Sequence, residues 1–590
     1  MDIQKITKSA IREIPKSWQM LFKNYLTPLS RKDIFYVNGL AIVVGVLTGY
    51  SSIGFRYLIG LLQNSILYHR FDWHLVSPLN HTRGYLMLLI VPVGFLISTL
   101  ITHFFAKEAK GHGVPEVIEA VMIKNGYMRK RLVAFKALAS SITIASGGSV
   151  GREGPIVQIG SAIGSSVGQL LALNPKLVKT LVGCGAAGAI AATFNTPIAG
   201  VIFAIEIIVL ELKTKSFVPL VISAVFATML SRYYLGNEPT FIVPHTVLTT
   251  PNELVFYLVL GVLAGVFGTF FIRLIYGFED FFDNFKIPFW VKPLVGGLII
   301  GGLGLYYPQI YGVGYESVTE ALQQKSAFSL MLLLIGLKMF ATSITLASGG
   351  SGGVFAPSLF IGAMLGGAYG FVVHQFFPEM TAEYGAYALV GMAAMFSATA
   401  RATFTAIVIL FEMTLNYSII LPLMLACVLA DQVSSILFRD SVYSLKLRRK
   451  GIKFVSDISV NILSITAVKE IMTNEIHFAE ENMNLKEALD KLSEYGHSVH
   501  PIVDENQKLI GKVTHLLLEK EFLKAPEKLI KDICSPVEAV VDAQDSALNA
   551  LSKIEKMRDP RVWVIEQNTK KLVGVVCPVD FVRLSLKDID

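Results

Sequence analysis

Long apolar segments alternate with short polar ones over most of the chain and give way to a mixed, soluble-type pattern after residue 450. An α-helix needs about 20 apolar residues to cross a hydrocarbon core. The apolar segments are residues 37–61, 85–102, 181–210, 217–229, 254–272, 294–305, 330–346, 360–373, 386–410 and 419–437. Many are short or contain Gly and Pro, which a membrane tolerates only where protein or a wet cavity surrounds the backbone. The pattern predicts a polytopic α-helical membrane protein with a buried pathway.

The apolar part contains an internal repeat. Residues 141–168 read SITIASGGSVGREGPIVQIGSAIGSSVG and residues 343–370 read SITLASGGSGGVFAPSLFIGAMLGGAYG, with about half of the positions identical. Two related halves that each cross the membrane an odd number of times form an inverted repeat, which brings broken helices together near the bilayer midplane. This architecture is typical of transporters and channels, and no enzymatic activity is expected.

Composition agrees with a lipid environment, because 53% of the residues are hydrophobic, 16% are charged and the mean hydropathy is +0.55. Basic residues lie on both sides of the apolar part: Lys5, Lys8, Arg12, Lys16 and Lys23 before it, and Lys446, Arg448, Arg449 and Lys450 after it. The positive-inside rule therefore places both termini in the cytosol. These clusters account for the net charge of +7 and suit lipid headgroups, so no nucleic-acid binding is expected. The four cysteines form no CxxC pair, and no metal site is expected.

The tail after residue 450 is also duplicated. Residues 468–472 (VKEIM) match 530–534 (IKDIC), and residues 508–511 (KLIG) match 571–574 (KLVG). Each copy has the pattern helix, strand, helix, strand, strand, helix. The predicted organisation is a cytosolic N-terminal segment (1–34), a transmembrane domain (35–445), a linker (446–465) and two cytosolic α/β copies (466–525 and 526–588).

Three phrases in the membrane part carry the candidate chemistry: Gly111-His112-Gly113-Val114-Pro115, Gly151-Arg152-Glu153-Gly154-Pro155 and Gly353-Val354-Phe355-Ala356-Pro357. Glycine permits close backbone approach and proline fits the first turn of a helix. Each phrase is therefore expected to open a helix with free N–H groups. Helix N-termini attract anions, so three converging starts would bind a small anion without a full counter-charge.

These phrases, with residues 194–200 (FNTPIAG), 411–414 (FEMT) and 441–443 (SVY), resemble the CLC family of chloride channels and chloride/proton exchangers over about residues 35–590. The tail resembles a pair of CBS modules. The resemblance implies the inverted-repeat CLC architecture and a homodimer with one pathway in each subunit. It also implies a chloride path that uses the backbone amides of Val354 and Phe355, the hydroxyl of Tyr443, and Glu153 as the gate.

The gating role makes physical sense for Glu153. The ionised carboxylate can occupy an anion site and block it, whereas the protonated form can swing away and carry a proton. The alternative is a structural ion pair with Arg152. His112 replaces a Ser or Pro that commonly contributes to the central anion site of the family. It either faces the anion or is a satisfied histidine turned away from it.

Ile207 departs from the family pattern, because exchangers usually carry a second, inner proton-transfer glutamate at this position. Isoleucine cannot relay a proton. Two mechanisms therefore stay open: chloride/proton antiport in which protons reach Glu153 by another route, and a passive voltage-gated chloride channel. The alternatives to chloride transport are a CBS-regulated transporter of fluoride, nitrate or a cation, and a membrane sensor.

Two further residue pairs recur in both halves. Lys136 and Lys338 either raise the local anion potential or snorkel to an interface or pair with a carboxylate. Glu206 and Glu412 are expected to be structural partners of helix ends.

The CBS resemblance implies regulation and an adenine nucleotide, such as ATP or AMP, between the copies. Ribose-binding copies commonly end in Thr or Ser followed three residues later by Asp. The first copy offers Thr514 and the second Asp580. The expectation is at most one nucleotide per subunit, held by Asp580 and Thr514, and the alternative is a structural pair that binds nothing. No other cofactor is required.

Overall fold

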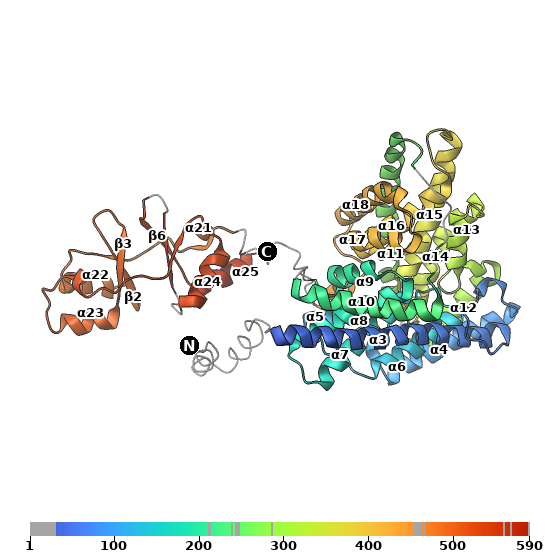
Figure 1. Cartoon of the computed structure of the whole chain (residues 1–590), viewed down its shortest axis with the longest axis horizontal. Coiled ribbons are helices and arrows are strands. Elements are labelled where there is room, and N and C mark those ends of the chain that lie inside the picture. Colours follow the sequence, from blue (N-terminus) through green and yellow to red (C-terminus); the bar gives the residue numbers. More distant parts are fainter. Residues whose placement is uncertain are drawn as a thin grey trace. The chain divides into compact units, whose positions relative to one another are not determined.

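The computed structural model describes residues 31–210, 214–237, 240–241, 248–284, 287–452, 463, 466–557, 561–566 and 569–587. The chain separates into two compact units, Met1–Phe454 and Val455–Asp590 (Figure 1). The basic residues of the predicted N-terminal segment, and most of the predicted linker, lie outside the described residues.

The described part of the first unit is built from helices. Its first half holds α3 (Arg31–Gln63), α4 (Met87–Phe104), α5 (Val114–Met122), α6 (Leu132–Ala145), α7 (Glu153–Leu170), α8 (Pro175–Phe194), α9 (Pro197–Phe203) and α10 (Thr214–Leu235). Its second half holds α11 (Leu254–Asn284), α12 (Val291–Tyr306), α13 (Tyr315–Leu322), α14 (Phe328–Ala347), α15 (Phe355–Phe376), α16 (Tyr384–Ala400), α17 (Thr403–Thr414) and α18 (Ile420–Leu437), followed by α19 (Ser444–Arg449). Eight helical segments of the described chain are long and apolar enough to cross a membrane.

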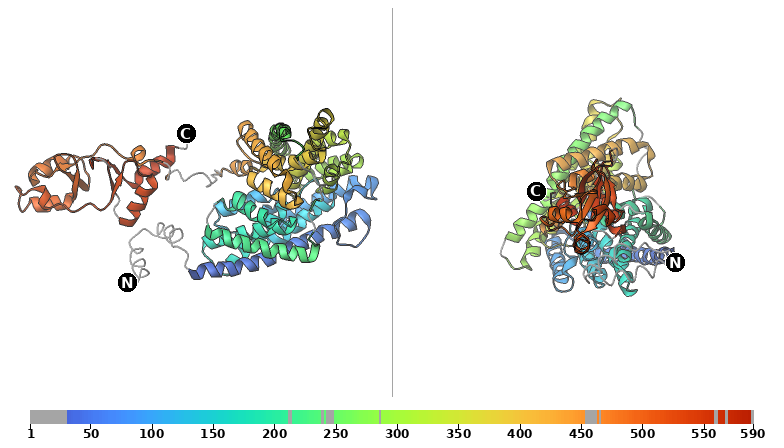
Figure 2. Two further views of the ribbon diagram at one scale, coloured as in Figure 1. Left: turned by 45° about the horizontal axis from the view of Figure 1, so that its top comes forward. Right: turned by 90° about the vertical axis from the view of Figure 1, so that its left-hand side faces the viewer.

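The two halves pack in the same way. Helix α3 packs against α8 and α10 in the first half, and α11 packs against α16 and α18 in the second. Figures 1 and 2 show these two groups on opposite sides of the unit. Where the halves meet, α4 packs against α12 and α9 against α17, so counterparts contact each other. Contacts between counterparts are what an internal two-fold axis produces.

Hydrogen bonds between the repeat segments are reciprocal. The Ser149 N–H donates to Thr345 Oγ1 at 3.2 Å, and the Ser351 N–H donates to Thr143 Oγ1 at 3.2 Å. Each residue of one pair holds the repeat position of a residue in the other. The sequence repeat therefore corresponds to a two-fold relation at the level of single hydrogen bonds.

Two apolar segments that were predicted as continuous are broken. Residues 181–210 span α8 and α9, because Asn195 has a left-handed backbone (φ 62°) and Pro197 starts the next helix. Residues 386–410 span α16 and α17, because Arg401 adopts the equivalent conformation (φ 57°). A left-handed residue at the C-cap ends an α-helix, and proline opens a new one more readily than it continues one.

The second unit contains two copies of a three-stranded α/β fold. The first copy holds α21 (Val468–Ile471), β1 (Ala479–Glu480), α22 (Leu485–Ser493), β2 (Val499–Val503), β3 (Leu509–Thr514) and α23 (His515–Phe522). The second opens with a 3-10 turn (Ile530–Asp532) and holds β4 (Val540–Asp542), α24 (Ala547–Met557), β5 (Val562–Ile565), β6 (Leu572–Val576) and α25 (Pro578–Lys587). Each sheet pairs its first two strands parallel and its last two antiparallel. The predicted order of elements is confirmed.

The opening segments of the two copies are exchanged. Val468 of α21 lies in the core of the second copy with Val541 and Val562. Ile530, which opens the second copy in sequence, lies in the core of the first copy with Ile502. Each copy therefore needs the other to complete its apolar core.

Candidate functional site

The three glycine-proline phrases each open a helix, as the sequence predicts: α5, α7 and α15. The phrases before α7 and α15 are joined directly. The Gly151 N–H donates to the Gly353 carbonyl at 2.8 Å, and the Gly353 N–H donates to the Gly151 carbonyl at 2.7 Å. Two helices from different halves therefore start side by side.

Backbone contact also joins the start of α5 to that of α7. A Cβ atom on Gly113, whose φ is +90°, would lie 2.6 Å from the Gly154 carbonyl oxygen. A Cβ on Gly154 would collide with the His112 carbonyl and lie 3.1 Å from Gly353 Cα. Only glycine permits this approach. The three phrases therefore converge on one region of the protein.

Glu153 is the carboxylate of this region, and its side chain is 1% exposed. Its Oε1 accepts a hydrogen bond of 2.7 Å from the Tyr315 hydroxyl. Arg152 Nε lies 4.0 Å from the same oxygen, which is beyond hydrogen-bond distance. A Cβ on Gly151 would collide with Glu153 Oε2 and lie 3.2 Å from Ala356 N. The carboxylate therefore lies over Gly151, against the first turn of α15.

Tyr315 is a site residue that the sequence analysis missed. It opens α13, and its ring packs edge-on against Phe241 with centroids 5.3 Å apart. A signal was present, because Gly312-Val313-Gly314 repeats the spacing of the glycines at 111 and 113. The start of α13 is thus a fourth helix start, and it supplies the partner of Glu153.

The two buried lysines hold the loops before α5 and α13. Lys136 Nζ donates to the carbonyls of Ala109 and Gly111, both at 2.8 Å. Lys338 Nζ donates to two carbonyls of the equivalent loop at 3.1 and 3.0 Å. Both lysines are fully buried. The alternative that they snorkel or pair with a carboxylate does not hold, because their partners are backbone carbonyls and, for Lys136, also Ser351 Oγ at 3.0 Å.

The predicted backbone donors at α15 have no partner of their own. The N–H groups of Val354 and Phe355 have no acceptor within the described residues. The Phe355 ring packs against Phe194 and Phe396 at centroid distances of 5.3 and 4.3 Å. Tyr443 precedes α19 and is 3% exposed, and no hydrogen bond to its hydroxyl is seen in the described chain. These groups are available to a ligand.

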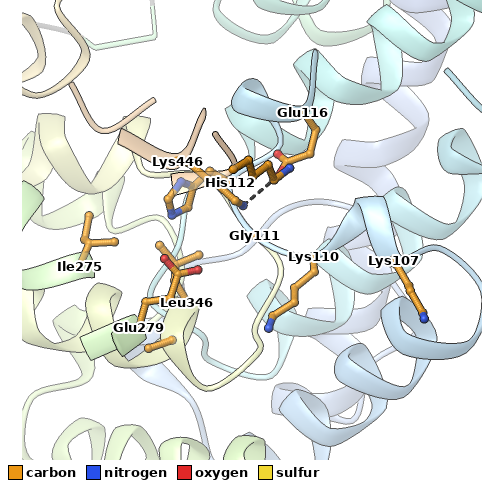
Figure 3. Close-up of a pocket in the computed structure, with 11 residues that line it drawn as sticks. Lys107, Lys110, Gly111, His112, Glu116, Ile275, Glu279, Leu346 and Lys446 are labelled. Carbon is orange, nitrogen blue, oxygen red and sulfur yellow. Dashed lines mark ion pairs between the residues drawn. The ribbon is translucent and has the colours of Figure 1, made fainter. Parts of the chain in front are cut away.

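His112 lines a cavity of about 250 Å³, together with Glu116 and Lys446 (Figure 3). Its side chain is buried, and its Nδ1 has no hydrogen-bond partner in the part of the chain that the structure describes. No protein group of the described residues therefore satisfies this ring nitrogen. Because water fills about 30 Å³ per molecule in the liquid, the cavity has room for several waters or a small hydrated ion.

One of the three helix starts differs from expectation. Glu116 Oε2 accepts the Gly113 N–H at 3.1 Å, in the capping position three residues into α5. Its Oε1 lies 2.8 Å from Lys446 Nζ. The start of α5 therefore carries its own carboxylate and cation, rather than only free donors.

Glu206 and Glu412 are partners of helix ends, as expected. Glu206 accepts two N–H groups in the first turn of α17 at 3.2 and 2.8 Å, and Glu412 accepts two in the first turn of α9 at 3.1 and 2.7 Å. Ile207 lies in a π-helical turn (Ala204–Val209) and is 5% exposed. No proton passes through this apolar side chain.

Thr514 and Asp580 lie at equivalent ends of the two tail copies. Thr514 caps α23, and its Oγ1 accepts the Leu517 N–H at 3.3 Å. Asp580 lies in the first turn of α25, is 6% exposed and accepts the Cys577 N–H at 2.7 Å through Oδ2. Both residues therefore already serve as helix caps. In the described residues, no group of three or more His, Cys, Asp or Glu side chains is arranged to hold a metal ion.

Histidine rings form a row in the first tail copy. His477 stacks on Tyr495 at a centroid distance of 3.4 Å, and His497, His500 and His515 follow with about 6 Å between successive centroids. His500 is fully buried, and neither ring nitrogen has a hydrogen-bond partner among the described residues. Burial lowers the pKa of His500 from 6.5 to about 4, because the charged ring loses its hydration.

Comparison with known proteins identifies both units. Residues 94–435 match the family model described as voltage gated chloride channel. The chain belongs to this family, the CLC proteins. Residues 468–516 match the CBS domain model, and the second tail copy repeats the same sheet, so the CLC unit is followed by a CBS pair. The predicted family and the inverted-repeat CLC architecture are confirmed, and the chain is an integral multi-pass membrane protein.

Similar CLC proteins come from several bacteria. A putative chloride channel protein, ClcB-like, of Ralstonia nicotianae is 33% identical over 414 residues, which cover 70% of this chain and 96% of the relative. The H(+)/Cl(-) exchange transporter ClcA of Vibrio cholerae serotype O1 is 33% identical over 431 residues, covering 71% of this chain and 90% of the relative.

Solved CLC structures share the fold. A slow cyanobacterial Cl-/H+ antiporter matches with a TM-score of 0.62 and 28% identity over 70% of this chain and 97% of that chain. A eukaryotic CLC transporter matches with a TM-score of 0.61 and 21% identity over 93% of this chain and 99% of that chain. The second likeness concerns the fold alone and extends into the tail.

Proposed function

We propose that this chain transports chloride, or a similar small anion, across a membrane through a pathway gated by Glu153. The observation that carries the proposal is the position of the Glu153 carboxylate over Gly151, against the first turn of α15. The neighbouring N–H groups of Val354 and Phe355 are unoccupied within the described chain, and such groups bind anions. A carboxylate in this place competes with a passing anion.

The gate follows from that competition. Ionised Glu153 occupies the position of an anion and accepts the Tyr315 hydroxyl, so the path is closed. A proton on Glu153 removes its charge and weakens its hold on the donors, and the side chain then leaves the path. The free donors at α15 and the Tyr443 hydroxyl next receive the anion. Protonation and anion passage are thereby linked in one side chain.

Whether anion transport is coupled to protons is a separate question. One observation favours antiport and another favours passive conduction. The ClcA relatives are named H(+)/Cl(-) exchange transporters, which favours antiport. Ile207 offers no proton-transfer group, which favours passive conduction. In an antiporter, protons would reach Glu153 through water or another side chain.

The remaining features of the proposal come from the family, except that the cytosolic placement of both termini comes from the positive-inside rule. The chain forms a homodimer with one pathway per subunit, both termini lie in the cytosol, and the CBS pair regulates transport. Regulation requires that a ligand of the tail favour one conformation over another.

Chloride efflux from liposomes containing the purified protein tests the proposal. Efflux well above that of protein-free liposomes is expected, with chloride preferred over fluoride and nitrate. A chain that releases no anion but remains folded and monodisperse would contradict transport and favour the sensor alternative. Release of a cation instead would contradict anion selectivity.

We further propose that the CBS pair binds one adenine nucleotide per subunit through Asp580 and Thr514. The support is that both residues lie at the start of the last helix of their copy, and that the Asp580 carboxylate is buried, with an Oδ1 that lies 3.7 Å from Arg583 and is not used by the Cys577 cap. Asp580→Ala should weaken ATP or AMP binding about tenfold, the effect of one lost charge-assisted hydrogen bond. Calorimetry on the full chain measures this. No heat with either nucleotide would mean that the pair is structural.

A further inference from the structure

The start of α5 poses an electrostatic problem for an anion pathway. Glu116 lies at this start with a side chain that is only 9% exposed, and it lines the same cavity as His112. A buried carboxylate beside the path repels an anion, and it takes up one of the N–H donors that would otherwise attract one. An anion that passes His112 therefore needs a cation to offset Glu116.

Lys446 supplies that cation from a distant part of the sequence. It lies in α19, three residues after Tyr443, and its Nζ is 2.8 Å from Glu116 Oε1 (Figure 3). The Nζ also approaches the α5 loop so closely that a Cβ on Gly111 would collide with it. Its side chain is 15% exposed and lines the cavity.

A second lysine leaves Lys446 free to change partners. Lys450 Nζ lies 3.9 Å from Glu116 and 2.7 Å from Glu119, so Glu116 keeps a neighbouring cation if Lys446 turns away. Lys107 and Lys110 line the cavity as well. The side chains around the cavity therefore include more cations than carboxylates.

His112 gives an independent sign of a ligand. Its buried Nδ1 has no partner among the described residues, although an unpaired buried nitrogen is costly. The His112 residue lines the same cavity as Lys446. A cavity lined by this cation and by a histidine with an unpaired ring nitrogen is suited to an anion with its hydration water.

We propose that Lys446 is an anion-binding residue of the pathway, which exchanges its Glu116 partner for the anion that enters beside His112. In the empty site Lys446 neutralises Glu116. In the occupied site Lys446 contacts the anion, and Lys450 retains Glu116. This inference rests on the proposed transport function.

The test is a double-mutant cycle that removes the charges of Lys446 and Glu116 singly and together. Lys446→Met removes the ammonium that contacts the anion and leaves Glu116 with Lys450 alone, at 3.9 Å, so the chloride concentration for half-maximal flux should rise about tenfold. Adding Glu116→Gln removes the repulsion, so the double variant should return to within about threefold of wild type. Lys446→Arg keeps the charge and should resemble wild type.

Arg448→Gln is the matched control. Arg448 lies in the same helix, pairs with Asp440, has a side chain that is 55% exposed and is absent from the cavity lining. It should leave the half-maximal concentration unchanged. An equal rise with Arg448→Gln would attribute the Lys446 effect to net charge and overturn the inference. A double variant as impaired as Lys446→Met would likewise overturn it and assign the pair a structural role.

Calorimetric titration of chloride into the detergent-purified variants separates this inference from the proposed function. If wild type binds chloride and Lys446→Met binds it about tenfold more weakly while neither moves chloride across liposomes, transport fails and the role of Lys446 stands. If wild type transports chloride but Lys446→Met changes neither binding nor half-maximal flux, the role of Lys446 fails and transport stands.

Discussion

The loops before α5 and α13 have the same backbone conformation but carry different functional side chains. Both carry two glycines of positive φ, at 111 and 113 in one and at 312 and 314 in the other, and a buried lysine binds two carbonyls of each. The first presents His112 to a cavity with Glu116. The second presents Tyr315 to Glu153. The duplicated scaffold is thus preserved, while its side chains have acquired different tasks.

The starts of α7 and α15 differ in the same manner. Glu153 and Phe355 hold the same repeat position, beside glycines that exchange hydrogen bonds. One start contributes a carboxylate that can be protonated. The other contributes backbone donors and an aromatic ring. Because the starts of α7 and α15 are repeat counterparts that contact each other, the Glu153 gate lies next to the backbone donors that it blocks.

The lysines should be the most sensitive part of the shared scaffold. Lys136→Met would leave two carbonyls and Ser351 Oγ, 3.0 Å from Nζ, without this donor, and should lower stability by about 3 kcal/mol. Lys338→Met removes only two bonds to carbonyls and should cost about 2 kcal/mol. Thermal unfolding in detergent measures both, with the exposed Lys130→Met as control. Equal stability of all three variants would refute the scaffold role.

The two tail copies also differ at one buried position, and this difference should make the stability of the first copy depend on pH. His500 of the first copy and Val562 of the second hold equivalent positions on β2 and β5, because they pair with the equivalent residues Val513 and Val576. The pKa of His500 is about 4 in the folded copy and about 6.5 in an unfolded chain, so the unfolded chain binds the extra proton between these values. Stability should therefore fall as pH drops from about 6.5 to 4, by up to about 2 kcal/mol at pH 5.

His500→Leu should remove most of that dependence, because leucine does not titrate. Urea unfolding of residues 455–590 at pH 7.5 and pH 5 gives the measurement. Wild type and His500→Leu losing equal stability on acidification would show that another group is responsible.

Tyr315→Phe tests whether the hydroxyl presented by the start of α13 holds the Glu153 gate, and we expect a smaller effect than for the lysine and histidine variants. The hydroxyl holds ionised Glu153 at 2.7 Å, so its removal should let protonation open the path at higher pH. The midpoint of the pH dependence of flux should rise by about one unit. Tyr369→Phe, which removes a hydroxyl bonded to the Phe256 carbonyl, is the matched control. An unchanged midpoint in Tyr315→Phe would mean that the hydroxyl does not hold the gate.

The sequence predicts the backbone plan well, because repeats and Gly-Pro phrases are local signals. The three helix starts belong to this class. The break before Pro197 also has a local signal, the proline itself, but the apolar pattern of residues 181–210 predicted one continuous segment. The break at Arg401 carries no such signal, since arginine rarely adopts a left-handed backbone. The exchange of opening segments between the CBS copies is likewise invisible, because both copies show the same apolar pattern.

Side-chain partners across the fold are harder to predict. Tyr315 and Glu153 are 162 residues apart, and Lys446 comes from the far end of the unit to reach Glu116. The sequence analysis groups Lys446 with the juxtamembrane basic residues, because Arg448, Arg449 and Lys450 follow it closely. Only the packing of α19 against α5 reveals its second role.

The central claim is that the charge of Glu153 closes the anion path and that its protonation opens it. Simultaneous recording of chloride and proton flux in liposomes, for wild type and Glu153→Gln, tests this most directly. Glutamine mimics the protonated carboxylate, so the account predicts that chloride flux persists in the variant, loses its pH dependence and moves no protons. Chloride flux in Glu153→Gln that keeps the pH dependence of wild type would contradict the account.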